Sequence, residues 1–174
     1  ILNSDAELFA KAKACQRLAI IGTSKSVPVV AQLLADPVLS HYARIALETN
    51  PSPEVDKVFR GALSELKGRQ LVGVINSIAT RKDTQSVDAL LPLAVGDNLE
   101  IAAAAVSALG MLATPESISA VQQALAQKPS LRVTAADACL TAADRLLVDG
   151  KNEAALLVLT ALRKAELPKH INVA

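Results

Sequence analysis

The sequence predicts an all-α fold of about five stacked helix pairs, wound as a right-handed α-α superhelix. Its 174 residues are 51% hydrophobic but include only two Phe, one Tyr and no Trp, so the core must consist of Ala, Leu, Val and Ile. Ala and Leu are strong helix formers, and no stretch alternates in polarity as a strand does. Apolar segments also recur at a nearly constant interval, which is typical of repeat proteins.

One apolar residue near the end of each Ala-rich segment marks the same position in every repeat, and we call these residues the anchors. Successive anchors lie 29, 31, 31 and 31 positions apart. The anchors are Leu18, Leu47, Ile78, Leu109 and Leu140. Four residues before them stand Ala14, Ala43, Val74, Ala105 and Ala136. Because residues at i and i+4 share one helical face, each segment is predicted to be the first helix of a repeat.

Five residues after each of the first four anchors stands a side chain that can accept a hydrogen bond from a free N–H at a helix start. These predicted caps are Thr23, Ser52, Asp83 and Thr114. Pro and Glu follow two of them, and both residues favour the first turn of a helix. Beyond the caps the i, i+4 spacing predicts a second helix in each repeat. Its apolar pairs are Val30 and Leu34, Phe59 and Leu63, Leu90 and Ala94, and Val121 and Leu125.

We therefore expect helix pairs at 5–21 and 25–35, 39–49 and 53–66, 69–80 and 84–95, 99–112 and 115–127, and 131–148 and 152–165. The repeats of a single domain, 1–174, then cover 5–37, 38–66, 67–96, 97–129 and 130–166. In the fifth repeat, Gly150 fits a helix end and Asn152 fits the cap of the next helix. Residues 167–174 look like the opening of a further repeat, so we expect a fragment of a larger multidomain protein.

Three short motifs resemble bacterial HEAT-like repeats, which also occur in phycobilisome lyase-type proteins. They are the Ala-Leu-Gly at 108–110 with the related segment 19–22, the turn Asp36-Pro37, and Arg44 within residues 43–47. The resemblance covers essentially the whole chain and implies a HEAT/armadillo-like solenoid. It also implies a scaffold that binds partners along a concave surface of second helices. The chain departs from the family pattern at residues 48–50, where Gly is usual. It also departs in the fifth repeat, whose first helix is longer.

Motifs of enzymes and metal sites are absent from the sequence. It contains no His-Glu-x-x-His, Cys-x-x-Cys, Gly-x-Ser-x-Gly or phosphate-binding glycine loop. His41 and His170 have no neighbour at ligand spacing, and we expect a surface or packing role for His41. Asp137 and Asp144 are interpreted as a solvated helix face. We therefore predict no catalytic residue, no metal site and no cofactor.

Four residues are expected to serve packing. Cys15 and Cys139 lie four repeats apart, too far for a disulfide, and are interpreted as small buried hydrophobes. Asn76 stands in an otherwise apolar stretch, where a buried amide must find hydrogen-bond partners. Gly73 in the same predicted helix costs stability relative to Ala, which indicates close approach of an adjacent helix.

Charge is unevenly distributed, although the formal net charge is only +1. Residues 57–82 carry six basic side chains and one acidic one, whereas residues 83–127 carry five acidic side chains and no Lys or Arg. The asymmetry is either ordinary solvated surface or a bipolar groove for a partner of matching charge. Second-helix positions away from the apolar pairs give the candidate partner-binding residues: Gln32, Lys57, Arg60, Ser64, Gln85, Asp88, Ser119 and Gln123.

These features predict a non-enzymatic scaffold or interaction module that binds a protein or peptide. One alternative is a structural spacer within a larger protein. Nucleic acid is a less favoured partner, because the basic stretch covers about two repeats and the acidic stretch would repel phosphate. An enzyme would need a cleft with convergent titratable groups. We predict no membrane-spanning segment, and we consider self-association through the C-terminal repeat.

Overall fold

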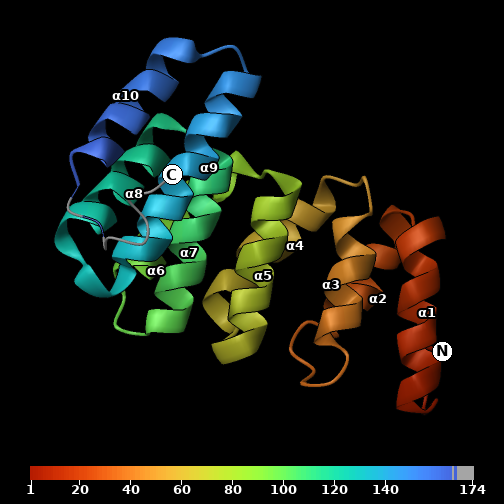
Figure 1. Ribbon diagram of the computed structural model, residues 1–174. Coiled ribbons are helices and arrows are strands. Elements are labelled where there is room, and N and C mark those ends of the chain that lie inside the picture. Colours follow the sequence, from red (N-terminus) through yellow and green to blue (C-terminus); the bar gives the residue numbers. More distant parts are fainter. Residues whose placement is uncertain (166, 168–174) are drawn as a thin grey trace. The chain divides into compact units, whose positions relative to one another are not determined.

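A computed structural model describes residues 1–165 and residue 167, and the regular secondary structure of this part of the chain is all helical. It contains ten α-helices, three short 3-10 helices and no strand. The helices pack in neighbouring pairs, which confirms the predicted fold class and is consistent with an α-solenoid (Figure 1). The chain divides into two compact units, residues 1–81 and residues 82–174. The further repeat predicted from 167 onward lies, apart from residue 167, outside the described residues, as does His170.

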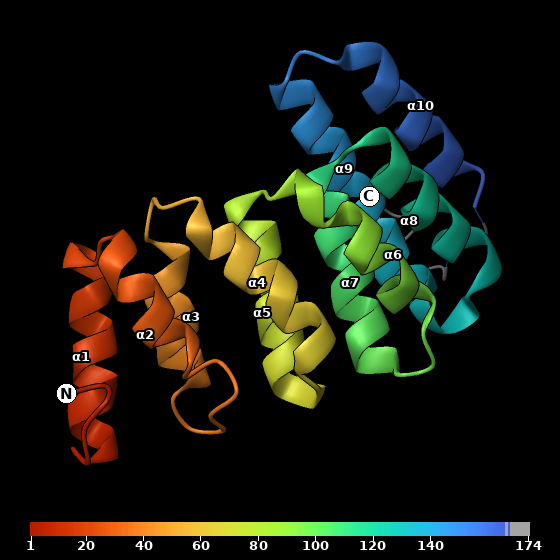
Figure 2. The same ribbon diagram turned by 180° about the vertical axis from the view of Figure 1, so that it is seen from behind.

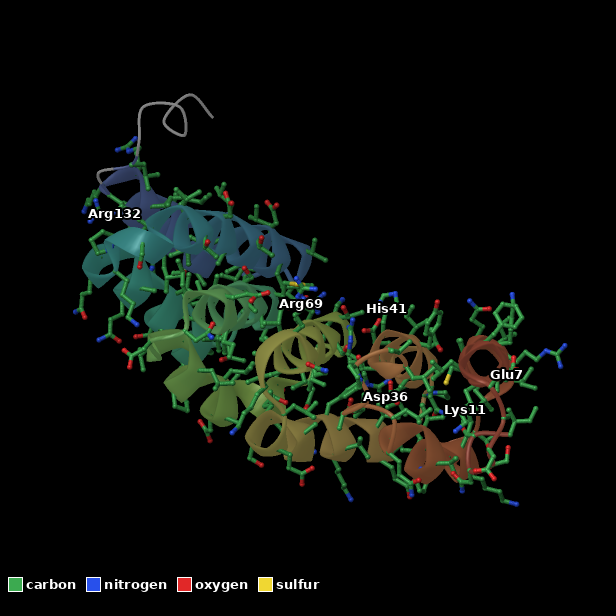
Figure 3. All side chains as sticks on the ribbon, turned by 90° about the horizontal axis from the view of Figure 1, so that it is seen from below. Glu7, Lys11, Asp36, His41, Arg69 and Arg132 are labelled. Atoms are coloured by element: carbon green, nitrogen blue, oxygen red, sulfur yellow. The ribbon has the colours of Figure 1, made fainter. Side chains whose placement is uncertain are left out.

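The first unit contains five α-helices in two layers. The helices are α1 (Leu8–Ile21), α2 (Val27–Ala31), α3 (Ser40–Glu48), α4 (Glu54–Glu65) and α5 (Gly68–Arg81), with a 3-10 turn at Ser24–Ser26. The first helices form one layer, in which α1 packs on α3 and α3 packs on α5. The second helices α2 and α4 form the other layer, and α4 pairs with α5 (Figures 1 and 3).

The second unit continues the alternation. It contains α6 (Val87–Val95), α7 (Leu99–Leu112), α8 (Pro115–Gln127), α9 (Arg132–Val148) and α10 (Asn152–Arg163), with 3-10 turns at Thr84–Ser86 and Pro129–Leu131. The first helices α7 and α9 pack side by side, and α8 leads the chain back so that both run in the same direction (Figure 1). The second helix α8 packs between α6 and α9, and α10 covers α9.

Second-helix burial follows the predicted spacing. All eight residues of the predicted pairs are buried, and Val30, Phe59, Leu90 and Val121 are at most 1% exposed. At about 25 cal/mol per Å² of apolar surface, full burial of each such large side chain contributes roughly 1.5–3 kcal/mol. These buried pairs hold the second helices against the first-helix layer of each unit.

Two of the four predicted caps act through their side chains, since Asp83 accepts from the N–H of Gln85 and Thr114 from that of Ser117. Ser52 is not the cap of α4, because the N-cap is Pro53, but its hydroxyl accepts from the N–H of Glu54 at the start of that helix. The hydroxyl of Ser117 in turn accepts from the N–H of Thr114, which completes a capping box. The prediction for Thr23 is wrong, because its side chain caps nothing. Its carbonyl is used instead, and it accepts from the N–H of Ser26 and the amide of Asn50.

Several helix ends differ from the prediction, among them that of α10, which ends at Arg163 rather than at residue 165. The first helix begins at Leu8 rather than at residue 5. Helix α2 ends at Ala31 rather than at residue 35, because the N–H groups of Leu33 and Leu34 bond three residues back and tighten the chain into turns. Gly150 ends α9 with φ of +74°, as predicted, but Asn152 is already helical and the cap residue Lys151 makes no side-chain bond.

One burial prediction is wrong. Asn76 is exposed, and the buried polar residue of that stretch is its neighbour Ser77. Leu140 is 40% exposed although the anchors of the three preceding repeats are buried, because no described helix stacks on that side of α9. The prediction for Gly73 is confirmed, since a Cβ there would lie 2.5 Å from Nε of Arg44 on the adjacent helix α3.

Two arginines tie the helices of the first unit together. Arg44 on α3 donates to the Gly73 carbonyl at 3.0 Å and to Oγ of Ser77 at 3.1 Å, both on α5. Arg81 at the end of α5 donates to the carbonyls of Glu48 and Asn50, at 3.0 and 2.7 Å. These oxygens lie at the C-terminal end of α3, where carbonyls lack helical partners. Both arginines therefore act as bridges between neighbouring repeats.

Candidate partner-binding surface

In the first unit, the predicted binding residues lie on the second helices. Lys57 and Ser64 are exposed, and with Gly61 they follow the outer face of α4 at the i, i+4, i+7 spacing. Arg60 is half-buried at the side of this row. Exposed Gln32 follows the last residue of α2 as its C-cap, and α2 packs on α4. A Cβ added at Gly61 would have no neighbour within 4 Å, so the α4 backbone is open to solvent at this point.

In the second unit, the four predicted residues are all exposed and lie in two rows. Gln85 lies in the turn before α6 and Asp88 in the first turn of that helix, while Ser119 and Gln123 lie one turn apart on α8. Helices α6 and α8 lie side by side (Figure 2). The structure thus brings these four residues onto one helix pair, and the bipolar groove across the whole chain stays a prediction.

A groove of about 350 Å³ runs between α6 and α8. Its walls are mostly apolar, and Gln123, Gln127 and Lys128 contribute the polar groups. The apolar lining residues are Leu91, Pro92, Ala94, Val95, Ala120 and Ala124. Sequence reasoning identified only Gln123 of this set. The proline inside the predicted helix is the sequence signal for the others, whereas the exposure of Val95 is visible only in the structure.

Pro92 also leaves an acceptor on α6. Proline has no N–H, so the carbonyl of Asp88 lacks the donor that residue i+4 normally supplies in a helix. At the other end of α6, Nζ of Lys128 donates to the carbonyl of Val95 at 2.7 Å. Lys128, which lines the groove, thus binds the last carbonyl of α6, whereas Asp88 lies on α6 outside the residues that line the groove.

Polar clusters elsewhere in the described part of the chain serve the fold. Ser77 donates to the Glu48 carboxylate at 2.5 Å and accepts from Arg44, but it is completely buried between α3 and α5. His41 is exposed on the outer side of α3 (Figure 3), where its ring meets Tyr42 edge to face. This contact confirms the surface or packing role expected for His41.

Neither a metal site nor a membrane span is found in the described residues. No group of three or more His, Cys, Asp or Glu side chains gathers there as metal ligands would. No helix among them has both the length and the hydropathy needed to cross a membrane. Cys15 and Cys139 are free and buried, as predicted. Burial raises the pKa of both thiols, that of Cys139 to about 11, so neither is activated as a nucleophile.

The sequence comparison agrees with the helix pairing. Residues 70–141 match the family of HEAT repeats. The match begins in α5 and ends in α9, so it includes α6, α8 and the groove between them. HEAT repeats generally serve as protein-interaction scaffolds and are typically non-enzymatic. A comparison with curated proteins gave no match.

Proposed function

We propose that this chain is a non-enzymatic scaffold that binds a protein or peptide along the outer faces of its second helices. The groove between α6 and α8 carries this proposal. Its apolar walls and few polar groups are typical of a site that accepts one or two apolar side chains. The match of residues 70–141 to HEAT repeats supports a binding role for the same segment.

The groove's surroundings indicate the chemistry of the partner. Asp88 and Glu116 are exposed on α6 and α8, and no Lys or Arg occurs between residues 83 and 127. A peptide that places an apolar side chain in the groove and a Lys or Arg beside Asp88 would pair with this charge. The carbonyl of Asp88 adds an acceptor for a backbone N–H of the peptide.

A peptide selection tests this function. The immobilised chain is exposed to a display library of random peptides, and the affinity of a selected peptide is measured by fluorescence anisotropy. We expect selected sequences to combine apolar and basic residues. Ala120→Arg, which places a cation in the groove, should weaken binding at least about tenfold, since 1.4 kcal/mol corresponds to a factor of ten.

The matched control is Ser107→Arg, which introduces the same side chain at an exposed position of the first helix α7. We expect it to leave the affinity unchanged. Equal losses from both variants would contradict a site on the second helices. A failure to select any peptide would favour the structural spacer, and retention of nucleic acid by the immobilised chain would favour the nucleic-acid alternative.

A further inference from the structure

The groove between α6 and α8 has a counterpart one repeat further along the chain. This second groove lies between α8 and α10 and has a volume of about 410 Å³. Helix α8 therefore has a groove on each side within the second unit. The residues that line the α8/α10 groove are Gln122, Leu125 and Ala126 of α8, Arg132 at the start of α9, and Ala161, Lys164 and Ala165 at the C-terminal end of α10.

The two grooves occupy the same place in the repeat. The buried pair Val121 and Leu125 of α8 corresponds to Leu90 and Ala94 of α6 and to Val158 and Leu162 of α10, which are all buried. This alignment places Gln122, Leu125 and Ala126 on Leu91, Ala94 and Val95 of the first groove. It also places Ala161, Lys164 and Ala165 on Ala124, Gln127 and Lys128.

Both walls of the α8/α10 groove stay open inside a continuous stack of repeats. Gln127 of α8 is exposed although α9 and α10 follow it, and Lys164 has the same place on α10. Ala126, on the opposite wall, is exposed although α10 packs beside α8. The opening is thus a property of the repeat and does not depend on where in the chain the repeat stands.

Charge distinguishes the two grooves. The α6/α8 groove is mostly apolar, and Nζ of its one lysine, Lys128, binds the carbonyl of Val95. The α8/α10 groove holds half-buried Arg132 (Figure 3) and exposed Lys164, and no acidic residue is among the described residues that line it. The C-terminal ends of α8 and α10 each carry about half a negative charge, less than the two full positive charges. The α8/α10 groove therefore suits a carboxylate.

The distance between the grooves constrains the conformation of a segment that enters both. Packed helices lie about 8–10 Å apart, so equivalent points of neighbouring grooves are separated by about this distance. In the polyproline II conformation side chains point the same way every three residues, a rise of about 9 Å. Side chains on one face of a β-strand lie about 7 or about 13 Å apart, and neither distance fits.

We propose that the partner binds the second unit as an extended segment in the polyproline II conformation. An apolar side chain of this segment occupies the α6/α8 groove, and an Asp or Glu three residues away occupies the α8/α10 groove, where it pairs with Lys164 and Arg132. This inference rests on the proposed function, since it takes the α6/α8 groove as the apolar site. It adds the conformation of the partner and an acidic residue at a defined spacing.

Charge exchange between chain and peptide tests the proposal. Peptides selected on the wild-type chain should carry an Asp or Glu three positions from the apolar residue. Replacing that acidic residue with Lys, or Lys164 with Glu in the chain, should each weaken binding about fivefold or more at low salt, measured by fluorescence anisotropy. The Lys-containing peptide should bind the Lys164→Glu chain more tightly than it binds the wild-type chain, because the charges are then exchanged.

The matched control is Arg163→Glu, the exposed neighbour of Lys164, which lies outside the residues that line the groove. It changes the net charge and the charge at the end of α10 as much as Lys164→Glu does, and the affinity should stay within about twofold of wild type. Circular dichroism should show the same helix content in both variants, because both side chains are exposed.

The outcomes separate this proposal from the proposed function. A selected peptide that is weakened by Ala120→Arg but not by Lys164→Glu would overturn the acidic site and leave the scaffold function standing. Equal losses from Lys164→Glu and Arg163→Glu, or no gain on charge exchange, would overturn it in the same way. A chain that selects no peptide, or one whose peptide is insensitive to Ala120→Arg, would overturn both.

Discussion

The guanidinium of Arg44 occupies the space that a side chain on Gly73 would need. A Cβ at Gly73 would lie 2.5 Å from Nε and 2.9 Å from Cζ of Arg44. The arginine cannot move aside freely, because it donates to the Gly73 carbonyl and to Ser77. We therefore expect Gly73→Ala to lower the free energy of unfolding by about 1–3 kcal/mol, as overpacking does. Urea denaturation measures this change, and an unchanged midpoint would contradict the contact.

Gly61 should respond in the opposite direction. It also lies inside a helix, but no atom stands within 4 Å of a Cβ added there. Gly61→Ala should raise the free energy of unfolding by about 0.5–1 kcal/mol, because Ala has the higher helix propensity. The same urea titration makes Gly61→Ala the matched partner of Gly73→Ala. Destabilisation by both substitutions would contradict the open space around Gly61.

Arg81 should be important for the stability of the first unit. Its side chain is 11% exposed and pairs with Asp56 while donating to the carbonyls of Glu48 and Asn50. Arg81→Met leaves these oxygens and the carboxylate without their donor, and we expect a loss of about 2–3 kcal/mol. Arg81→Lys keeps the charge but loses the planar guanidinium with its several N–H donors. It should therefore lower the free energy of unfolding by less than Arg81→Met does. Thermal unfolding would rank the three proteins, and equal melting temperatures for all three would contradict this role.

The buried thiol of Cys139 should make stability depend on pH in the alkaline range. Burial raises its pKa from the ordinary 9.0 to about 11. Between these values the unfolded chain has lost the proton and the folded chain keeps it, so the free energy of unfolding falls as pH rises from 9 to 11. Below pH 9 the thiol is protonated in both states and contributes no pH dependence.

Urea titrations at pH 8 and pH 10.5 on wild type and Cys139→Ala would isolate this effect, since the other titrating groups are common to both proteins. We expect the pH-dependent loss to be smaller in Cys139→Ala. The same loss in both proteins would mean that the thiol does not titrate as its burial requires.

Periodicity was sufficient to predict the helix pairs and two of the four caps, because spacing and capping are local properties of the chain. Burial also depends on what stacks against each helix. Leu140 has the same place in its repeat as buried Leu109, yet it is exposed because no described helix covers that side of α9. The sequence predicts a buried Asn76 because its neighbours are apolar on both sides, so the pattern does not indicate which residues of the helix face the core. In the structure Asn76 faces outward and Ser77 faces inward.

The candidate surface was predictable only in part. Asp88 and Gln123 could be assigned to an exposed helix face from their spacing relative to the buried pairs. The groove between them could not, because its width depends on how closely α6 and α8 approach. Small side chains such as Ala94, Ala120 and Ala124 line that groove. They are also common in the buried core, so their presence alone did not distinguish a groove wall from a packed interface.

Site-specific photo-cross-linking tests the central claim, binding through the second helices, most directly. A benzophenone amino acid replaces Ser119 on α8 or Ser107 on α7, two exposed serines of the same unit. Each protein is irradiated with the peptide selected on the wild-type chain. We expect the peptide to cross-link from position 119 and not from position 107. Cross-linking only from position 107, or equally from both positions, would contradict binding through the second helices.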